Sequence, residues 1–135
     1  MSSTFKLLRI RCGLSQREAT TLLQVSESSI HNWDQGRRTA PFGVVDDLRR
    51  LYRQIESAAQ QLLILIKSAP DATEIELGLA ADDYEAQELG LPCVGAHEAL
   101  LGLVIIGCDK IIKIVPRGST SSTAGAIQAR ETDAK

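Results

Sequence analysis

Between residues 26 and 39 the chain carries side chains suited to hydrogen bonding and to neutralising negative charge. Asn32 can donate and accept hydrogen bonds through one amide group, as recognition of adenine requires, and Glu27 can accept one from the amino group of cytosine. Arg37 and Arg38 follow shortly afterwards, and guanidinium groups bind phosphates well. These residue types favour recognition of a polar, anionic partner over covalent chemistry.

Two short helices are expected to hold these side chains in place. Ser15 followed three residues later by Glu18 forms a capping-box pattern, which predicts a helix from Gln16 to about Leu23. Ser26 suits the N-cap of a second helix from about Glu27 to Gln35. Because only three residues, Gln24, Val25 and Ser26, separate these helices, a short turn must join them.

Longer helical patterns flank this pair. A helix from about Thr4 to Cys12 is expected to end at Gly13, and Pro41 suits the first turn of a long helix that reaches about Lys67. Apolar residues of the long helix recur at alternating steps of four and three, which is a heptad seam. They are Val44, Leu48, Leu51, Ile55, Ala58, Leu62 and Leu65. The C-terminal part of this seam needs a partner beyond a small N-terminal domain.

The pattern changes after residue 70 to strand, helix, helix and strand. Alternating polarity predicts a strand over residues 74–79, and a second strand is expected over 109–115. Between them lie a short helix over 82–89 with an acidic start and a nearly all-apolar helix over 96–106. Residues 117–135 are rich in Ser, Thr, Gly and Ala and are predicted to form a disordered tail. The expected fold is therefore mainly α.

The segment GLSQREATTLLQVSESSIHNWDQGRRTAP, residues 13–41, resembles the helix-turn-helix of the phage Cro and CI repressor family, also called the XRE family. The likeness extends over residues 4–55. Several residue types match family positions: Leu14, Ala19, Val25 and Ile30 in the core, Trp33 beneath the second helix, and Asp34-Gln35-Gly36 at its end. The resemblance implies a DNA-binding domain over 1–54, a dimerisation region over 55–116 and the tail.

The resemblance also assigns roles to individual side chains. Those that fall at base-reading positions of the helix in the major groove are Glu27, Ser28, Ser29 and Asn32. Those expected at the DNA backbone are Gln16, Arg17, His31, Arg37, Arg38 and Thr39, with solvent as the alternative for His31. Arg49, Arg50 and Arg53 are instead expected on a solvated helix face that pairs with Asp46, Asp47 and Glu56.

Arg9 and Asp34 stand where the family often places a buried ion pair, so both are predicted to be structural residues, together with Trp33. Such a pair would fix the second helix of the motif relative to the first helix of the chain. The alternative is that Arg9 contacts a phosphate.

The family binds DNA as twofold dimers, which places two reading helices about 34 Å apart. We expect the dimer interface in the region after residue 54, and a private core of one chain is the alternative. The leading interface candidates are Leu62, Leu65, Ile66, Leu101, Val104, Ile105, Ile112 and Ile114. The overall layout resembles that of anti-CRISPR-associated repressors, which implies a regulator that silences its own operon from an inverted-repeat operator.

Charge is distributed unevenly along the 135 residues, although the net charge is only −2. Residues 1–53 carry a net charge of +4, residues 54–115 carry −7, and residues 116–135 carry +1. This asymmetry places nucleic-acid binding in the N-terminal part.

Several classes of protein are not supported by the sequence. The apolar stretches are too short to span a bilayer and no signal peptide is recognisable, so the protein is expected in the cytoplasm. Three scattered cysteines and two distant histidines predict no metal site, and no cofactor or catalytic motif is present. An antitoxin that binds a partner toxin and a ligand-sensing regulator remain alternatives to a repressor.

Overall fold

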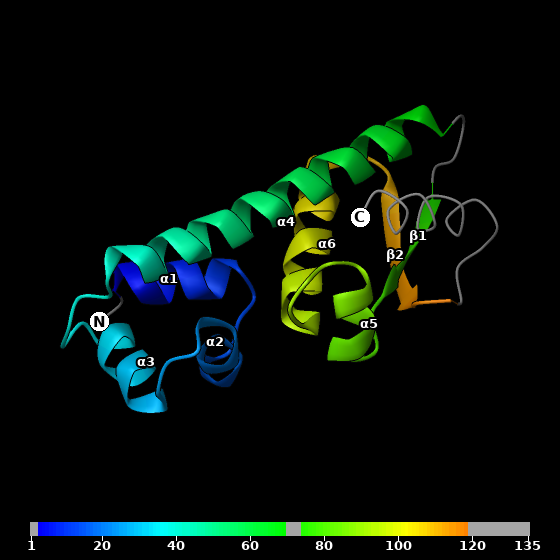
Figure 1. The fold of residues 1–135 in the computed structure, drawn as a ribbon. Helices are drawn as coiled ribbons and strands as arrows, with labels where there is room; N and C mark the ends of the chain where they lie inside the picture. The colour runs from blue at the N-terminus through cyan, green and yellow to red at the C-terminus, as the bar shows by residue number, and fades with distance from the viewer. Residues whose placement is uncertain (1–2, 70–73, 119–135) are drawn as a thin grey trace.

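The structure is a computed structural model that describes residues 3–69 and 74–118 of the chain. Its described residues form six helices and two strands (Figure 1). In chain order these are α1 (Thr4–Arg11), α2 (Gln16–Leu23), α3 (Glu27–Asp34), α4 (Phe42–Ser68), β1 (Glu74–Leu79), α5 (Asp83–Glu88), α6 (Val94–Gly107) and β2 (Ile111–Pro116). The expected mainly α fold and the order of its elements are confirmed. The predicted tail lies largely outside the described residues.

Local capping signals set the ends of α2 and α3. The Ser15 hydroxyl accepts a hydrogen bond from the Glu18 amide at 3.1 Å, and the Glu18 carboxylate accepts one from the Ser15 amide at 2.8 Å. The Ser26 hydroxyl caps α3 in the same way by accepting from the Ser29 amide at 3.1 Å. Gln24 adopts the left-handed conformation, with φ of 56°, and ends α2. The turn between α2 and α3 is therefore built as the sequence predicts.

A small apolar core joins α1, α2 and α3 beneath the start of α4. Phe5 and Trp33 meet edge to face, with their ring centroids 5.3 Å apart, and both side chains are buried. Ala19 and Ile30 are completely buried beside them, while Val25 is half-buried at the turn. The core positions implied by the family resemblance are thus filled as expected.

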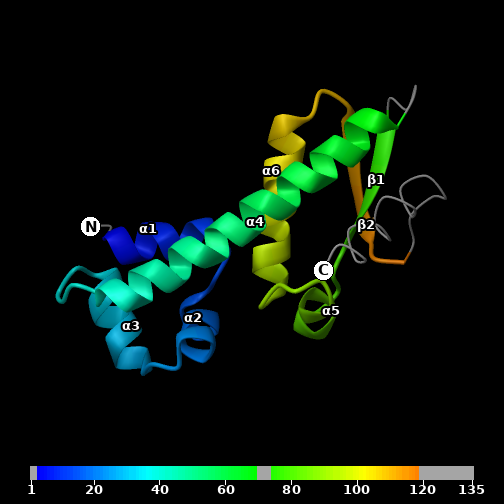
Figure 2. The ribbon, with the colours of Figure 1, turned by 45° about the horizontal axis from the view of Figure 1, so that its top comes forward.

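Helix α4 runs the full length of the molecule. Its 27 residues extend for about 40 Å, so its N-terminal half packs on α1 while its C-terminal half packs on α6 (Figures 1 and 2). The heptad seam faces inward along nearly this whole length, since Leu48, Ile55 and Leu62 are all buried. One chain therefore supplies both partners that the seam requires.

The C-terminal part of the chain is a β–α–α–β unit. Strands β1 and β2 pair in parallel, with Glu74 opposite Ile111 and Leu79 opposite Pro116. Parallel strands need a crossover connection, and α5 and α6 provide it. The amino group of Lys110 donates to the carbonyl oxygens of Ile66 at 2.9 Å and Ala69 at 3.1 Å, which ties the start of β2 to the end of α4.

The two parts of the chain touch directly through backbone atoms at Gly13 and Gly95. A Cβ atom on Gly95 would overlap the carbonyl oxygen of Gly13, and one on Gly13 would overlap the carbonyl group of Gly95. Gly13 also has φ of +74°, a conformation that favours glycine. This contact between the α1–α2 turn and the first turn of α6 is called the glycine joint below.

Four residues predicted for the dimer interface lie instead inside a single chain. Leu62, Ile66, Leu101 and Val104 belong to the buried core because α6 packs along α4 and covers them. Their prediction as interface residues is wrong, and the intramolecular alternative holds for them. Of the other four candidates, Ile105 and Ile114 are exposed, and Leu65 and Ile112 are half-buried.

None of the helices in the described ranges combines the length and the apolar character needed to cross a membrane.

Candidate functional site

The outward face of α3 carries the polar side chains singled out in the sequence. Glu27, Ser28 and His31 are exposed, and Ser29 and Asn32 are half-buried at the edges of the same helix. The hydroxyl of Ser29 also receives a hydrogen bond from the Ser26 hydroxyl at 3.0 Å. The first turn of α3 therefore presents hydrogen-bonding groups to solvent.

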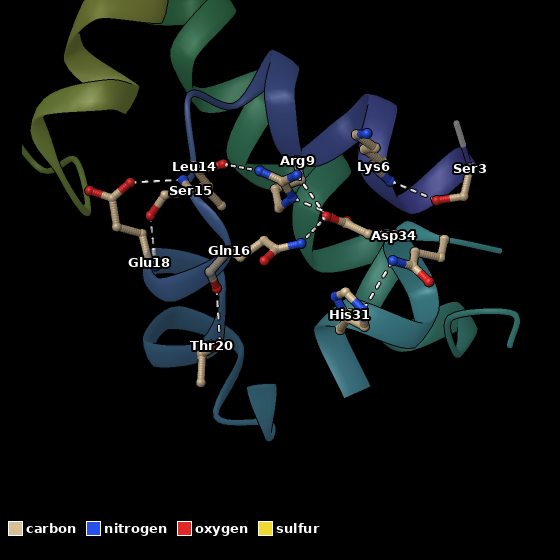
Figure 3. Close-up of polar contacts among 11 residues, drawn as sticks. Ser3, Lys6, Arg9, Leu14, Ser15, Gln16, Glu18, Thr20, His31 and Asp34 are labelled. Carbon is tan, nitrogen blue, oxygen red and sulfur yellow. Dashed lines mark hydrogen bonds and ion pairs between the residues drawn. The ribbon is translucent and has the colours of Figure 1, made fainter. Parts of the chain in front are cut away.

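A buried ion pair holds α3 against α1. The Arg9 guanidinium donates to both carboxylate oxygens of Asp34, through Nη2 at 2.7 Å and Nε at 3.2 Å (Figure 3). Its remaining nitrogen donates to the carbonyl oxygen of Leu14 at 2.8 Å. The predicted pair is therefore present, and the guanidinium is buried and fully engaged. The alternative in which Arg9 contacts a phosphate does not fit this geometry.

Gln16 extends the same network to α2. Its side-chain amide donates to Asp34 at 2.8 Å, so a single carboxylate receives hydrogen bonds from α1 and α2 (Figure 3). The sequence predicted this side chain at the DNA backbone and missed its contact with Asp34. One side-chain amide hydrogen of Gln16 and the backbone amides of Gln16 and Arg17 remain available to a ligand, whereas the Glu18 amide is bonded to Ser15.

The network controls the ionisation of Asp34. Burial opposes its negative charge, but hydrogen bonds from Arg9 and Gln16 and the positive charges of Arg9 and Lys6 outweigh that effect. The pKa of Asp34 is therefore lowered from its usual value, and the carboxylate is charged at neutral pH.

Residues from α2 and α3 together line a groove between the first turns of these two helices. Its lining includes Gln16 and Arg17 from α2 and Glu27, Ser28 and His31 from α3. The structure thus brings predicted backbone-contacting and base-reading residues onto one surface. His31 also lies 3.0 Å from the side-chain amide of Gln35, which orients its ring along the helix (Figure 3).

Positive charge borders this surface. Arg17, Arg37, Arg38 and Thr39 are all exposed. None of these arginines forms an ion pair with another residue in the described part of the chain. On α4, by contrast, Arg50 pairs with Asp46 at 2.7 Å, as the sequence predicted for that helix face. Arg49 and Arg53 are exposed there without an ion pair among described residues.

The N-terminal elements and their geometry correspond to a known domain. Residues 1–61 match the family model described as a helix-turn-helix domain. Within this match, α2 and α3 with the turn between them form a helix-turn-helix. Neither the curated proteins nor the solved structures compared with the chain contain a match. The helix-turn-helix domain is the DNA-binding domain of regulators, and here α2 and α3 are its two central helices.

The cysteines lie outside the outward face of the helix-turn-helix domain. Burial, together with the proximity of Cys93, raises the pKa of Cys12 to about 11. Burial is also the main cause that raises the pKa of Cys93 to about 11, and Glu18 and Asp83 add to the effect. Both thiols are therefore protonated and poor nucleophiles at neutral pH. Among the described residues there is no cluster of three or more possible metal ligands.

Proposed function

We propose that the protein is a sequence-specific transcriptional repressor that binds an inverted-repeat operator in double-stranded DNA as a homodimer. The observation that carries this proposal is the polar face of α3, which Asp34 fixes against α1 and α2 and which exposed arginines border. The function is binding rather than catalysis, and it is exercised in the cytoplasm.

Base reading is assigned to α3, since an α-helix fits the major groove and presents its first turns to the base edges. Asn32 can bind adenine through two hydrogen bonds, and Glu27 can accept one from cytosine. Ser28 and Ser29 can serve either as donors or as acceptors. This combination would recognise a short half-site that contains both kinds of base pair.

Affinity is assigned to contacts with the phosphates. Arg17 stands at the start of α2, and Arg37 and Arg38 follow α3, so the cations border the reading helix on two sides. Thr39 adds a hydroxyl donor, and the backbone amides of Gln16 and Arg17 suit a phosphate oxygen. These contacts would hold the domain in register while α3 reads the sequence.

A dimer is proposed because one helix-turn-helix domain reads too few base pairs to select a site in a genome. Two domains related by a twofold axis read both halves of an inverted repeat. The XRE-like sequence pattern and the layout resembling anti-CRISPR-associated repressors support a regulator that silences its own operon. A promoter fusion in the presence and absence of the gene tests this, and unchanged expression would contradict it.

The direct test of the function is selection of binding sites from a random pool of duplex DNA by the full chain. We expect enrichment of two inverted half-sites at a constant spacing. Recovery of no preferred sequence, together with no duplex affinity at low salt, would refute the proposal. A chain with Glu27, Ser28 and Asn32 all replaced by alanine is the matched control, because these side chains carry no structural contact that the fold requires.

A further inference from the structure

The core-facing side of the sheet is less completely buried at β2 than at β1. On that side β1 contributes Ile75 and Leu77, which are buried, whereas their neighbours on β2 are Ile112, which is half-buried, and Ile114, which is 40% exposed. Parallel sheets are normally covered on both faces. The apolar side of the sheet therefore continues past the helices that cover β1.

More exposed isoleucines lie on the elements that adjoin this strand. Ile105 and Ile106 lie near the end of α6, six and five residues before β2 begins. The exposed fractions are 45% for Ile105, 83% for Ile106 and 40% for Ile114. These three residues are called the isoleucine surface. The side chain of Ile111 alternates to the other face of the sheet, which it shares with Lys113.

The outer edge of β2 also offers backbone groups. The amide of Arg117 donates to the carbonyl oxygen of Leu79 in β1 at 3.0 Å, so the odd-numbered residues of β2 point toward β1. The backbone groups of Ile112 and Ile114 consequently point to the opposite edge, where no third strand pairs with them in the described residues. The backbone nitrogen of Pro116 also points to the outer edge. Its lack of an amide hydrogen therefore removes no hydrogen bond to β1.

We propose that this edge of β2 and the isoleucine surface form the interface with a second copy of the chain, through antiparallel pairing of the two β2 strands. The proposal rests on the proposed function, which requires a twofold dimer. Pairing would join two parallel two-stranded sheets into one sheet of four strands in the order β1, β2, β2, β1. Only Ile112 and Ile114 of each copy need to exchange backbone hydrogen bonds.

Charge does not oppose the approach of two β2 strands, although each is flanked by cations. Lys110 is bound to carbonyl oxygens at the end of α4, and Arg117 pairs with Glu88 at 3.1 Å. Lys113 lies on the other face of the sheet in register with Glu76. The cations of the strand thus have neighbours of their own within one chain.

The remaining segments of the same chain are poor candidates to cover this surface. Residues 119–135 contain one large apolar residue, Ile127, and residues 70–73 contain none. One isoleucine side chain is too small to cover the three isoleucines of this surface. A second copy, by contrast, brings an identical apolar surface and an identical free strand edge, which is what a twofold interface requires.

The test compares molar masses in solution for the full chain and for two variants. Ile114→Asp places a charge on the isoleucine surface at a position that one chain leaves accessible. Ile10→Asp is the matched control, because Ile10 is 54% exposed on α1 at the other end of the molecule. We expect twice the 14.6 kDa of one chain for the wild type and the control, and 14.6 kDa for Ile114→Asp.

A second variant tests the strand edge itself. Ile114→Pro removes an outward amide and leaves the bonds to β1 intact, so it should also yield a folded monomer. Lys113→Pro removes an amide that faces β1 and should instead disturb the fold, as measured by circular dichroism. A monomeric wild type would overturn the inference and would mean that Lys113 and Pro116 protect this edge from pairing. A dimeric Ile114→Asp variant would overturn it as well.

Measurements of DNA binding distinguish a failure of this inference from a failure of the proposed function. The monomeric variant should keep its affinity for a single half-site and lose about 100-fold or more on the complete operator, because the linked second contact is gone. A wild-type dimer that binds no duplex would refute the repressor and leave the interface standing. An Ile114→Asp variant that remains a dimer and binds normally would refute only the interface.

Discussion

Replacing Arg9 by methionine would expose what the buried ion pair contributes. Methionine retains most of the side-chain volume but leaves the Asp34 carboxylate buried with Gln16 as its remaining side-chain donor. Removing one partner of a buried pair typically costs about 3–5 kcal/mol, and the donor that remains places our expectation near about 3 kcal/mol. Natural domains have a total stability of only about 5–15 kcal/mol, so the loss is a large fraction.

Trp33 provides the assay. It is the sole tryptophan of the chain and is buried against Phe5, so its fluorescence reports unfolding of the domain that contains the ion pair. With a urea m-value of about 2 kcal/mol/M, the expected loss lowers the midpoint by about 1.5 M. Arg50→Met is the control, since its partner Asp46 is a surface i, i+4 neighbour, and such pairs contribute less than about 0.5 kcal/mol.

The pH dependence supplies a second, independent measurement. Because the pKa of Asp34 is lowered in the folded protein, its contribution to stability is present above the unfolded pKa of about 3.9 and is lost as pH falls through the folded value. The difference between wild type and Arg9→Met should therefore shrink below about pH 4. Equal midpoints for Arg9→Met and Arg50→Met at pH 7 would refute the reasoning. Full stability with weakened DNA binding would assign Arg9 to a phosphate.

Three further substitutions test base recognition, phosphate binding and the contact between the two parts of the chain separately. Asn32→Ala should relax preference at one base position and cost about 1–3 kcal/mol on the selected half-site, as measured by competition with base-substituted duplexes. Arg37→Ala should weaken all duplexes alike and reduce the slope of log affinity against log salt by about one ion; selective loss on one sequence would contradict this. Gly95→Ala should open the glycine joint with Gly13 and lower the thermal midpoint of the full chain, while its affinity for a single half-site is retained; unchanged stability would contradict the contact.

Local signals explain why the sequence predicted the N-terminal half closely. Ser15, Glu18 and Ser26 act on backbone atoms only three residues away, so the ends of α2 and α3 follow from neighbouring residue types. The Arg9–Asp34 pair could be anticipated only through the family resemblance, since it joins residues 25 positions apart. Gln16 is 18 positions from Asp34, and no local pattern indicates its participation.

Long-range packing explains the errors in the C-terminal half. A heptad seam shows that α4 has an apolar face but not which chain covers it, so Leu62 and Ile66 were assigned to a partner copy. The parallel pairing of β1 with β2 was likewise not predictable, because periodicity indicates strands without indicating their direction. The glycine joint gave no signal either, since it depends on the approach of Gly13 and Gly95 across more than half of the chain.

The unbroken course of α4 has a consequence for the DNA that the protein can tolerate. A continuous helix behaves as a stiff rod. In the proposed dimer the angle between the two helix-turn-helix domains is therefore set by the protein and not by the duplex. Each added base pair rotates one half-site about the duplex axis by roughly 34–36°, because a turn takes about 10–10.5 base pairs. Operators lengthened by a single base pair should therefore be rejected as firmly as operators with a wrong base.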